Sequence, residues 1–357
     1  MRGRGAGTNP KNRFRTIHTE RNPDLNAAEA YEPEFDESSP KTELIEDHSR
    51  SILSSNDSPD VPFSKSINPY RGCEHGCAYC YARPTHEYFG LSAGLDFETK
   101  IVVKYKAAEL LREEFTKMRW TGEVLGISGV TDAYQPVERT LQITRKCLAV
   151  CAEFQNPVMI VTKSDLIVRD VDILQQLAAA GAVSVAISVT TLDLQLARKL
   201  EPRATSPRRR MEAIRALAKA NIPVSVLVAP VIPGLNDHEI PEILKTAAEA
   251  GARFAGYVLL RLPHGVKDIF TEWLELHTPN SINRVLHRVA ETRGGKLSDP
   301  RFGTRMRGEG VYAEHIRGLF TLARKRHGYS LDYPALSAST FRRPKPSGGQ
   351  QLLFPSL

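Results

Sequence analysis

Three of the five cysteines in this 357-residue chain crowd into one short segment, as Cys73, Cys77 and Cys80. Closely spaced thiols, odd in total number and without an apolar leader at the start of the chain, argue against a disulfide framework and favour metal ligation. Thiolates spaced Cys-x3-Cys-x2-Cys can each ligate one iron of a 4Fe–4S cluster and leave the fourth iron open. Gly72 and Gly76 permit the tight backbone that such a loop needs.

The spacing of these thiols also leaves room for a zinc site or for free cysteines. A zinc site would combine the three cysteines with His75 or a distant ligand, although structural zinc sites usually use two short-spaced pairs. Cys147 and Cys151 lie four residues apart on one face of an expected helix, and buried core cysteines are the better interpretation of that pair.

Short apolar runs alternate with amphipathic helical patterns through the middle of the chain. Continuous apolar runs are typical of parallel strands buried on both faces, and we expect them at 123–128, 158–162, 183–189, 224–229 and 255–260. The expected helices are 106–117, 141–154, 171–180, 208–220 and 240–250. This repeat of βα units predicts an α/β fold, an open, partial (β/α)6 TIM-like barrel, with its active site at the C-terminal ends of the strands.

Composition divides the chain into four parts. Residues 1–60 are expected to form a flexible N-terminal arm, and residues 61–278 form the core, with the cysteine loop at 73–80. A basic C-terminal extension follows at 279–334, with a helix near 310–326, and a flexible tail at 335–357.

Charge is unevenly distributed along the chain. From residue 279 onward the chain has fourteen Lys or Arg against five Asp or Glu, which accounts for its net charge of +7. Such a surplus suggests contact with nucleic acid or another polyanion, or simply a solvated basic surface. No apolar run is long enough to span a membrane, and we expect a cytoplasmic protein.

The cysteine spacing, with an aromatic residue directly before the last cysteine, resembles the signature of the radical S-adenosylmethionine (radical SAM) superfamily. The resemblance extends over residues 65–265. Within the superfamily, Asn68-Pro-Tyr-Arg-Gly-Cys, Thr131-Asp132 and Thr162-Lys163-Ser164 are similar to the branch related to spore photoproduct lyase, often called "DNA repair photolyase"-like.

The resemblance implies an enzyme that holds a 4Fe–4S cluster and binds S-adenosylmethionine. One electron from the cluster would cleave the cofactor to a 5′-deoxyadenosyl radical, which abstracts hydrogen from a substrate. A reducing partner, such as a flavodoxin- or ferredoxin-like donor, is also implied.

The same resemblance assigns further residues to the cofactor. Tyr79 would lie beside the adenine, Lys163 would bind the methionine carboxylate and Ser188 the ribose. Thr131 and Asp132 stand where the superfamily often has a Gly-Gly-Glu run that binds the methionine amino group.

Gly129 departs from the pattern of the branch. The resemblance to spore photoproduct lyases implies a cysteine at this position, which returns a hydrogen atom. Glycine lacks the thiol that would donate the hydrogen atom, so the sequence names no catalytic residue and does not predict thymine-dimer repair. A nucleic acid base is the preferred substrate. A peptide or small metabolite is the enzymatic alternative, and a zinc-stabilised basic nucleic-acid-binding module is the non-enzymatic one.

Two basic segments have simpler interpretations. The run that includes Arg203, Arg208, Arg209 and Arg210 is read as a solvated helix face, with contact to a phosphate or carboxylate as the alternative. The Gly- and Arg-rich segment 302–310 lacks the spacing of a phosphate loop and is expected to be a bent connection, with nucleic-acid contact as the alternative.

Overall fold

The computed structural model describes residues 4–14, 41–127, 129–333 and 335–344. Residues 345–357 of the predicted tail, and residues 1–3 and 15–40 of the predicted arm, lie outside the described residues. Within the described part of the chain, no helix is long and apolar enough to cross a bilayer.

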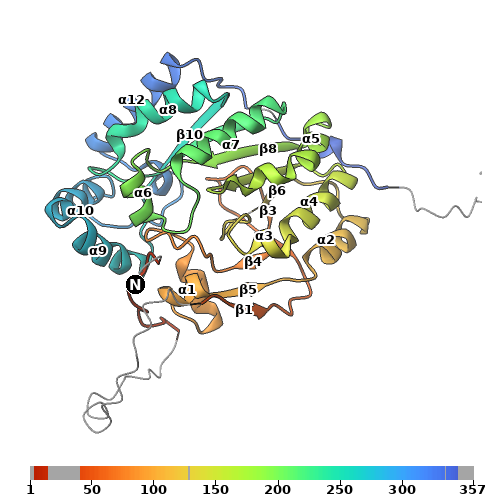
Figure 1. The fold of residues 1–357 in the computed structure, drawn as a ribbon, viewed down its shortest axis with the longest axis horizontal. Coiled ribbons are helices and arrows are strands. Elements are labelled where there is room, and N and C mark those ends of the chain that lie inside the picture. Colours follow the sequence, from red (N-terminus) through yellow and green to blue (C-terminus); the bar gives the residue numbers. More distant parts are fainter. Residues whose placement is uncertain (1–3, 15–40, 128, 334, 345–357) are drawn as a thin grey trace, which may run out of the picture.

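The central element is an open seven-stranded sheet in the order β10-β9-β8-β7-β6-β3-β2. Six neighbouring strands are parallel, and β2 joins β3 antiparallel at one edge. The predicted partial (β/α)6 barrel is therefore confirmed (Figure 1). The strands are β2 (Leu53–Ser55), β3 (Lys65–Ile67), β6 (Leu125–Ile127), β7 (Val158–Thr162), β8 (Val183–Ser188), β9 (Val224–Val231) and β10 (Phe254–Leu259).

Helices cover the outer face of this sheet and follow it in an arc (Figure 1). They bury the outward side chains of the strands, as Val183, Val185 and Ile187 of β8 show. All five helices expected between the strands are present, within two residues of their predicted ends. These are α2 (Ala107–Thr116), α4 (Ile143–Glu153), α5 (Val171–Ala179), α7 (Pro207–Lys219) and α8 (Ile240–Glu249).

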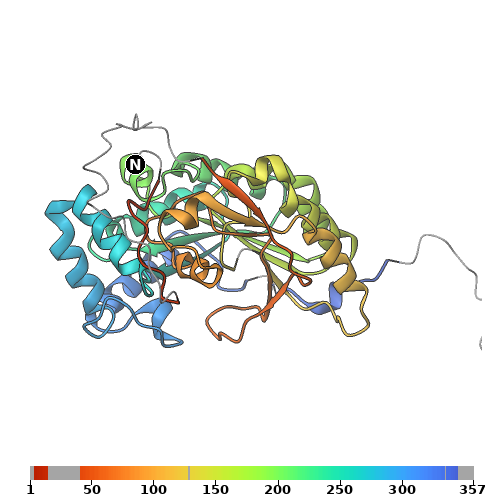
Figure 2. The ribbon, with the colours of Figure 1, turned by 90° about the horizontal axis from the view of Figure 1, so that it is seen from below.

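The inner face of the sheet is different, and burial of the strands on both faces was a wrong expectation. Val161 of β7 is 36% exposed, and Ala186 and Leu227 on the neighbouring strands are only partly buried. Figure 2 shows the helices that alternate with the strands, coloured yellow to green, on one side of the sheet, with the orange β2–β3 hairpin on the other. Apolar runs on the inner face therefore line an accessible surface rather than a second packed layer.

Side chains from the C-terminal extension cover the free edge of β10. Tyr333 donates a hydrogen bond to the carbonyl of Ala255 (2.8 Å), and Arg307 donates to that of Tyr257 (2.9 Å). The unpaired backbone N–H and C=O groups of an edge strand can pair with a strand of another chain. In β10 the extension satisfies two of these carbonyl groups by side-chain hydrogen bonds.

The remaining elements lie around the mouth of the barrel and on its lower side, except α12, which packs beside α8 (Figure 1). Most of them have no counterpart among the elements predicted from the sequence, although α12 occupies the range predicted to hold a helix near 310–326. They are α1 (Leu95–Thr99), α3 (Glu138–Leu141), α6 (Leu194–Leu200), α9 (Val266–His277), α10 (Ile282–Glu291), α11 (Thr304–Arg307) and α12 (Val311–Arg326), with a small sheet of β1 (Glu43–Glu46), β5 (Lys100–Val103) and β4 (Tyr70–Arg71).

The described residues of the expected arm and tail make specific contacts. The backbone N–H groups of Gly5 and Ala6 donate to the buried carboxylate of Glu98 (3.0 and 2.8 Å). At the other end of the chain, the ring of Phe341 lies 6.1 Å from that of Phe154. These described stretches therefore pack on the core and do not behave as a non-globular chain there. Composition does not reveal such contacts, because each one depends on a single backbone donor or a single aromatic ring.

Gly5 offers a direct test of this N-terminal contact. A Cβ atom on Gly5 would lie 1.7 Å from the carbonyl oxygen of Gly76, whereas one on Gly7 would meet nothing within 4 Å. We therefore expect Gly5→Ala to displace residues 4–8 from the cysteine loop and Gly7→Ala to leave them in place. Hydrogen exchange of the amides of Gly5 and Ala6 measures the effect. Equal protection in both variants would contradict the packing described.

Candidate active site

The cysteine loop, residues 73–80, follows β4 and has neither helix nor strand of its own. Neighbouring elements hold it: the N–H of Cys73 donates to the carbonyl of Phe97 (2.8 Å), and that of Ala78 donates to Leu200 (3.0 Å). The fully buried guanidinium of Arg83 donates to the carbonyl of Cys77 (2.8 and 3.0 Å) and pairs with Glu98. The loop is thus fixed from several sides.

The donor set and the backbone of this loop fit an iron–sulfur cluster. Cys73 and Cys77 are buried, Cys80 is partly buried, and all three are free thiols. Burial raises the pKa of Cys73, and the neighbouring Asp132, Cys77 and Cys80 add to that rise. Three thiols this close together would repel one another as thiolates, and a bound cationic metal centre relieves that repulsion.

Glycine at position 76 is required by the same packing. Gly76 has a φ of +65°, and a Cβ atom on it would lie 2.6 Å from a carboxylate oxygen of Glu98.

Among the described residues, no three His, Cys, Asp or Glu side chains are grouped tightly enough to hold one metal ion. A cubane cluster instead needs one thiolate at each of three separate irons.

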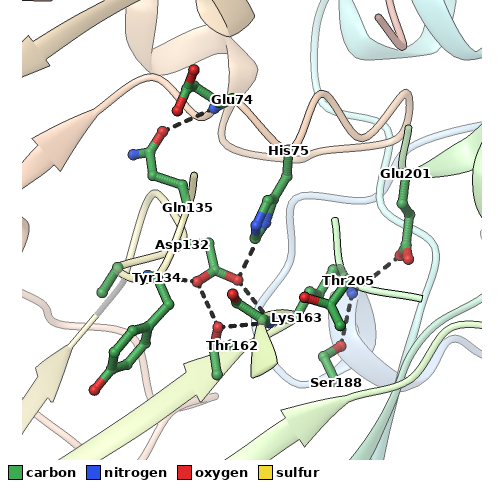
Figure 3. Close-up of polar contacts among 12 residues, drawn as sticks. Glu74, His75, Asp132, Tyr134, Gln135, Thr162, Lys163, Ser188, Glu201 and Thr205 are labelled. Atoms are coloured by element: carbon green, nitrogen blue, oxygen red, sulfur yellow. Dashed lines mark hydrogen bonds and ion pairs between the residues drawn. The ribbon is translucent and has the colours of Figure 1, made fainter. Parts of the chain in front are cut away.

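Lys163 and Ser188 lie at the C-terminal ends of β7 and β8, next to each other, as expected (Figure 3). The Lys163 ammonium donates to the hydroxyl of Ser188 (2.8 Å), to that of Thr190 (3.3 Å) and to the carbonyl of Ala229 on β9 (2.7 Å). Tyr79 joins this group to the cysteine loop, because its ring lies 5.7 Å from the Lys163 ammonium.

A buried carboxylate, Glu201, organises this side of the mouth. It accepts hydrogen bonds from Tyr79 and Thr190, pairs with Arg210, and lies 3.5 Å from the Lys163 ammonium. Burial by itself would raise the pKa of Glu201, but the charges of Arg210 and Lys163 outweigh it and lower the pKa to about 2. Glu201 is therefore ionised and neutralises the cations beside the loop.

The interpretation of the arginine run as a solvated helix face is wrong for Arg210, which is 1% exposed. Besides Glu201, it donates to the carbonyls of Ser188 (3.0 Å) and Thr205 (2.7 Å). Arg203 and Arg209 pair with Glu74 and Asp165, and Arg208 is exposed as expected. A run of arginines in the sequence does not distinguish a side chain that is solvated from one that pairs with a carboxylate far away in the sequence.

Asp132 links the loop after β6 to β7 and to the cysteine loop (Figure 3). Its carboxylate accepts from the hydroxyl of Thr162 (2.6 Å) and from the N–H of Lys163 (2.7 Å), and lies 3.5 Å from Nδ1 of His75. The hydroxyl of Thr131 donates to the carbonyl of Tyr70 (3.1 Å). Both residues support neighbouring backbone here, and their contact with a cofactor stays a prediction.

Gln135 makes a further link that the sequence analysis missed. Its side-chain amide donates to the carbonyl of Gly72 (3.1 Å) and accepts from the N–H of Glu74 (2.9 Å), which fixes the start of the cysteine loop. Gly129 lies nearby, and its carbonyl accepts a hydrogen bond from Tyr81 (2.9 Å).

Comparison with known proteins agrees with this geometry. The sequence profile described as the Radical SAM superfamily matches residues 67–247, half of the chain. The chain belongs to the radical SAM superfamily, and it is an enzyme of that class.

Individual relatives differ in how much of them the chain matches. An uncharacterized protein of Mycobacterium tuberculosis is 35% identical over 239 residues, 66% of this chain and 70% of the relative. A protein of Pseudomonas phage M6 named radical SAM Nalpha-GlyT isomerase is 27% identical over 50% of this chain and 35% of its own length. Spore photoproduct lyase, solved with a dinucleoside spore photoproduct, has a similar fold, with a TM-score of 0.58 over 80% of each chain at 15% identity.

The buried Glu201–Arg210 pair predicts a large stability effect. Glu201→Gln leaves the Arg210 charge buried without its partner, which should lower the free energy of unfolding by about 3 kcal/mol. Glu212→Gln removes the same charge from an exposed pair with Arg208 and should change it by less than about 0.5 kcal/mol. Urea unfolding followed by circular dichroism measures both variants, and similar losses in the two would contradict the assignment of Glu201 as a buried ionic centre.

Proposed function

We propose that Cys73, Cys77 and Cys80 ligate a 4Fe–4S cluster, and that the adjacent barrel mouth binds S-adenosylmethionine to attack a base in a nucleic acid. One observation carries this proposal: Lys163 and Ser188, from separate strands, lie against each other, and the ring of Tyr79, from the cysteine loop, lies beside the Lys163 ammonium. The site thus combines a cation, hydroxyls and an aromatic ring beside three thiols.

Each of these side chains suits one part of the cofactor. The Lys163 ammonium now rests on hydroxyl and carbonyl oxygens, and an incoming carboxylate is a stronger partner for a point charge. Ser188 offers a hydroxyl to the ribose, and Tyr79 offers a ring to the adenine. Asp132 holds the N–H of Lys163, so its role in the proposal is to position that lysine as well as to approach the methionine amino group with Thr131.

When bound, the cluster and S-adenosylmethionine supply hydrogen abstraction by a 5′-deoxyadenosyl radical. The chain's own residues orient the cofactor and keep water from it, since Cys73, Cys77 and Tyr79 are each less than a tenth exposed. The partly exposed inner face of the barrel, which includes Val161, offers the substrate a way to the mouth. An external reductant, of the flavodoxin or ferredoxin class, would supply the electron.

The nucleic-acid class of substrate rests on two observations. The extension after residue 279 has fourteen basic and five acidic residues, which favours binding of polyanions. The solved protein of similar fold, spore photoproduct lyase, holds a dinucleoside spore photoproduct. Gly129 has no thiol that could return a hydrogen atom, so the proposal does not extend to repair of that photoproduct.

Anaerobic reconstitution with iron and sulfide tests the cluster assignment. The reduced protein should bind iron and convert S-adenosylmethionine to 5′-deoxyadenosine, and Cys77→Ala should abolish both. Cys151→Ala is the matched control, because Cys151 is fully buried in the core away from the loop, and it should retain the cluster. Binding of zinc in place of iron by the wild-type protein would overturn the proposal.

Lys163 can be tested by cofactor binding alone. Lys163→Gln removes the charge proposed for the methionine carboxylate, and we expect the dissociation constant of S-adenosylmethionine to rise about tenfold or more, as for the loss of a hydrogen bond to a charged group. Lys146→Gln, on the exposed side of α4, should leave it unchanged. Isothermal titration of the oxidised, cluster-loaded protein measures both, and unchanged affinity in Lys163→Gln would remove Lys163 from the site.

A further inference from the structure

The Gly- and Arg-rich segment 302–310 borders an open pocket of about 540 Å³ in the C-terminal extension. The pocket lies between the free edge of β10, α11 and one side of α12, along which its lining runs from Gly310 to Arg324, and the barrel mouth contributes nothing to it. Three arginines line it: Arg307 from α11, and Arg317 and Arg324 from α12. The function proposed above does not use this pocket.

Arg307 is held in place before any ligand arrives. Its guanidinium donates to the carbonyl of Tyr257 (2.9 Å) and lies 4.2 Å from the centre of the Tyr257 ring. A guanidinium has five N–H donors. Among the described residues, the side chain of Arg307 makes one hydrogen bond, to the carbonyl of Tyr257. The other donors of a fixed, planar fork are suited to phosphate oxygens.

Arg317 and Arg324 are seven residues apart on α12, which places them on one face of the helix, two turns apart. Within the described part of the chain, neither has a carboxylate within ion-pair distance. Two carboxylates also line the pocket. Glu309 is paired with Arg301 at 2.7 Å. Among the lining residues, the negative charge of Glu314 therefore stands opposite the positive charges of three arginines.

The start of α12 adds donors to the same place. Its N-cap, Gly310, has a φ of +86° and provides no side-chain cap. The first N–H groups of a helix lack partners within the helix and favour negative charge. Gly310 also lines the pocket, so a bound anion would meet backbone donors as well as arginines.

We propose that this pocket binds a backbone phosphate of a nucleic-acid substrate, at a position flanking the base that enters the barrel. The inference rests on the proposed function and deepens it by locating the strand. Tyr257 and Arg261 lie on one extended segment of β10 and the loop after it, so the pocket is about 13 Å from the mouth at roughly 3.3 Å per residue. At the mouth, Arg261 stacks on Tyr81 of the cysteine loop (4.9 Å).

The experiment measures binding of a fluorescent single-stranded oligonucleotide to the reconstituted protein by anisotropy, at several salt concentrations. Arg317→Gln with Arg324→Gln should weaken binding about tenfold and reduce the slope of log affinity against log salt by about 0.7, the value for one lost phosphate contact on a single strand. The matched control is Arg215→Gln with Lys219→Gln, which removes two exposed charges from α7 and should bind as the wild type does.

Three results would overturn the inference. Wild-type affinity in the Arg317 and Arg324 variant removes the pocket from the binding surface. Equal weakening in the α7 variant shows a diffuse charge effect instead of a site. Competition by inorganic phosphate or a mononucleotide as effective as that by unlabelled oligonucleotide identifies a small-anion pocket.

The proposed function has a separate readout in the same samples. Both double variants should keep the wild-type iron content and form 5′-deoxyadenosine with S-adenosylmethionine alone. Absence of that product in the wild type would count against the radical chemistry, whereas a change confined to anisotropy concerns the pocket.

Discussion

The mouth of this barrel depends on buried pairing between arginine and glutamate. The cysteine loop has no helix or strand of its own, so its shape must come from partners with fixed geometry. Arg83 with Glu98 holds the carbonyl of Cys77 on one side, and Arg210 with Glu201 holds the hydroxyl of Tyr79 on the other. Because a buried charge left without its partner costs several kcal/mol, each pair stays in one arrangement and the loop is held with it.

Lys163 differs from these arginines in a way that suits a binding group. Arg210 is fully buried and uses its fork on Glu201 and on two carbonyls, so it cannot leave without exposing a charge. The Lys163 ammonium rests mainly on neutral oxygens, and Glu201, its charged neighbour, is already neutralised by Arg210. It can therefore exchange those oxygens for a cofactor carboxylate while the Glu201–Arg210 pair stays intact. In the proposed function, positioning and binding are thus divided between two kinds of cation.

The local sequence pattern predicted most of the parallel strands and helices, because hydrophobic periodicity within a short segment determines these elements. Five apolar runs marked five of the six parallel strands, and Lys163 and Ser188 lie together at strand ends because the ends of parallel strands meet at one edge. The strand β3 was missed, since three residues before the cysteine loop give no periodicity. Glu201 and Arg210 were missed because their burial depends on packing of α6 and α7 against the loop. The open inner face of the sheet was missed because β-branched residues look the same whether they line a core or an accessible wall.

An open barrel explains why a basic extension is attached to this core. A sheet that ends at β10 leaves backbone carbonyls without partners, and Arg307 and Tyr333 satisfy two of them from the extension. The extension is also tied to the opposite edge, where Arg305 pairs with Asp60 in the β2–β3 hairpin at 2.5 Å. The edge contacts lie along β10: Tyr333 reaches Ala255 near the start of the strand, and Arg307 reaches Tyr257 in its middle. The same contacts that satisfy the edge of the sheet therefore also fix the position of Arg307 along β10.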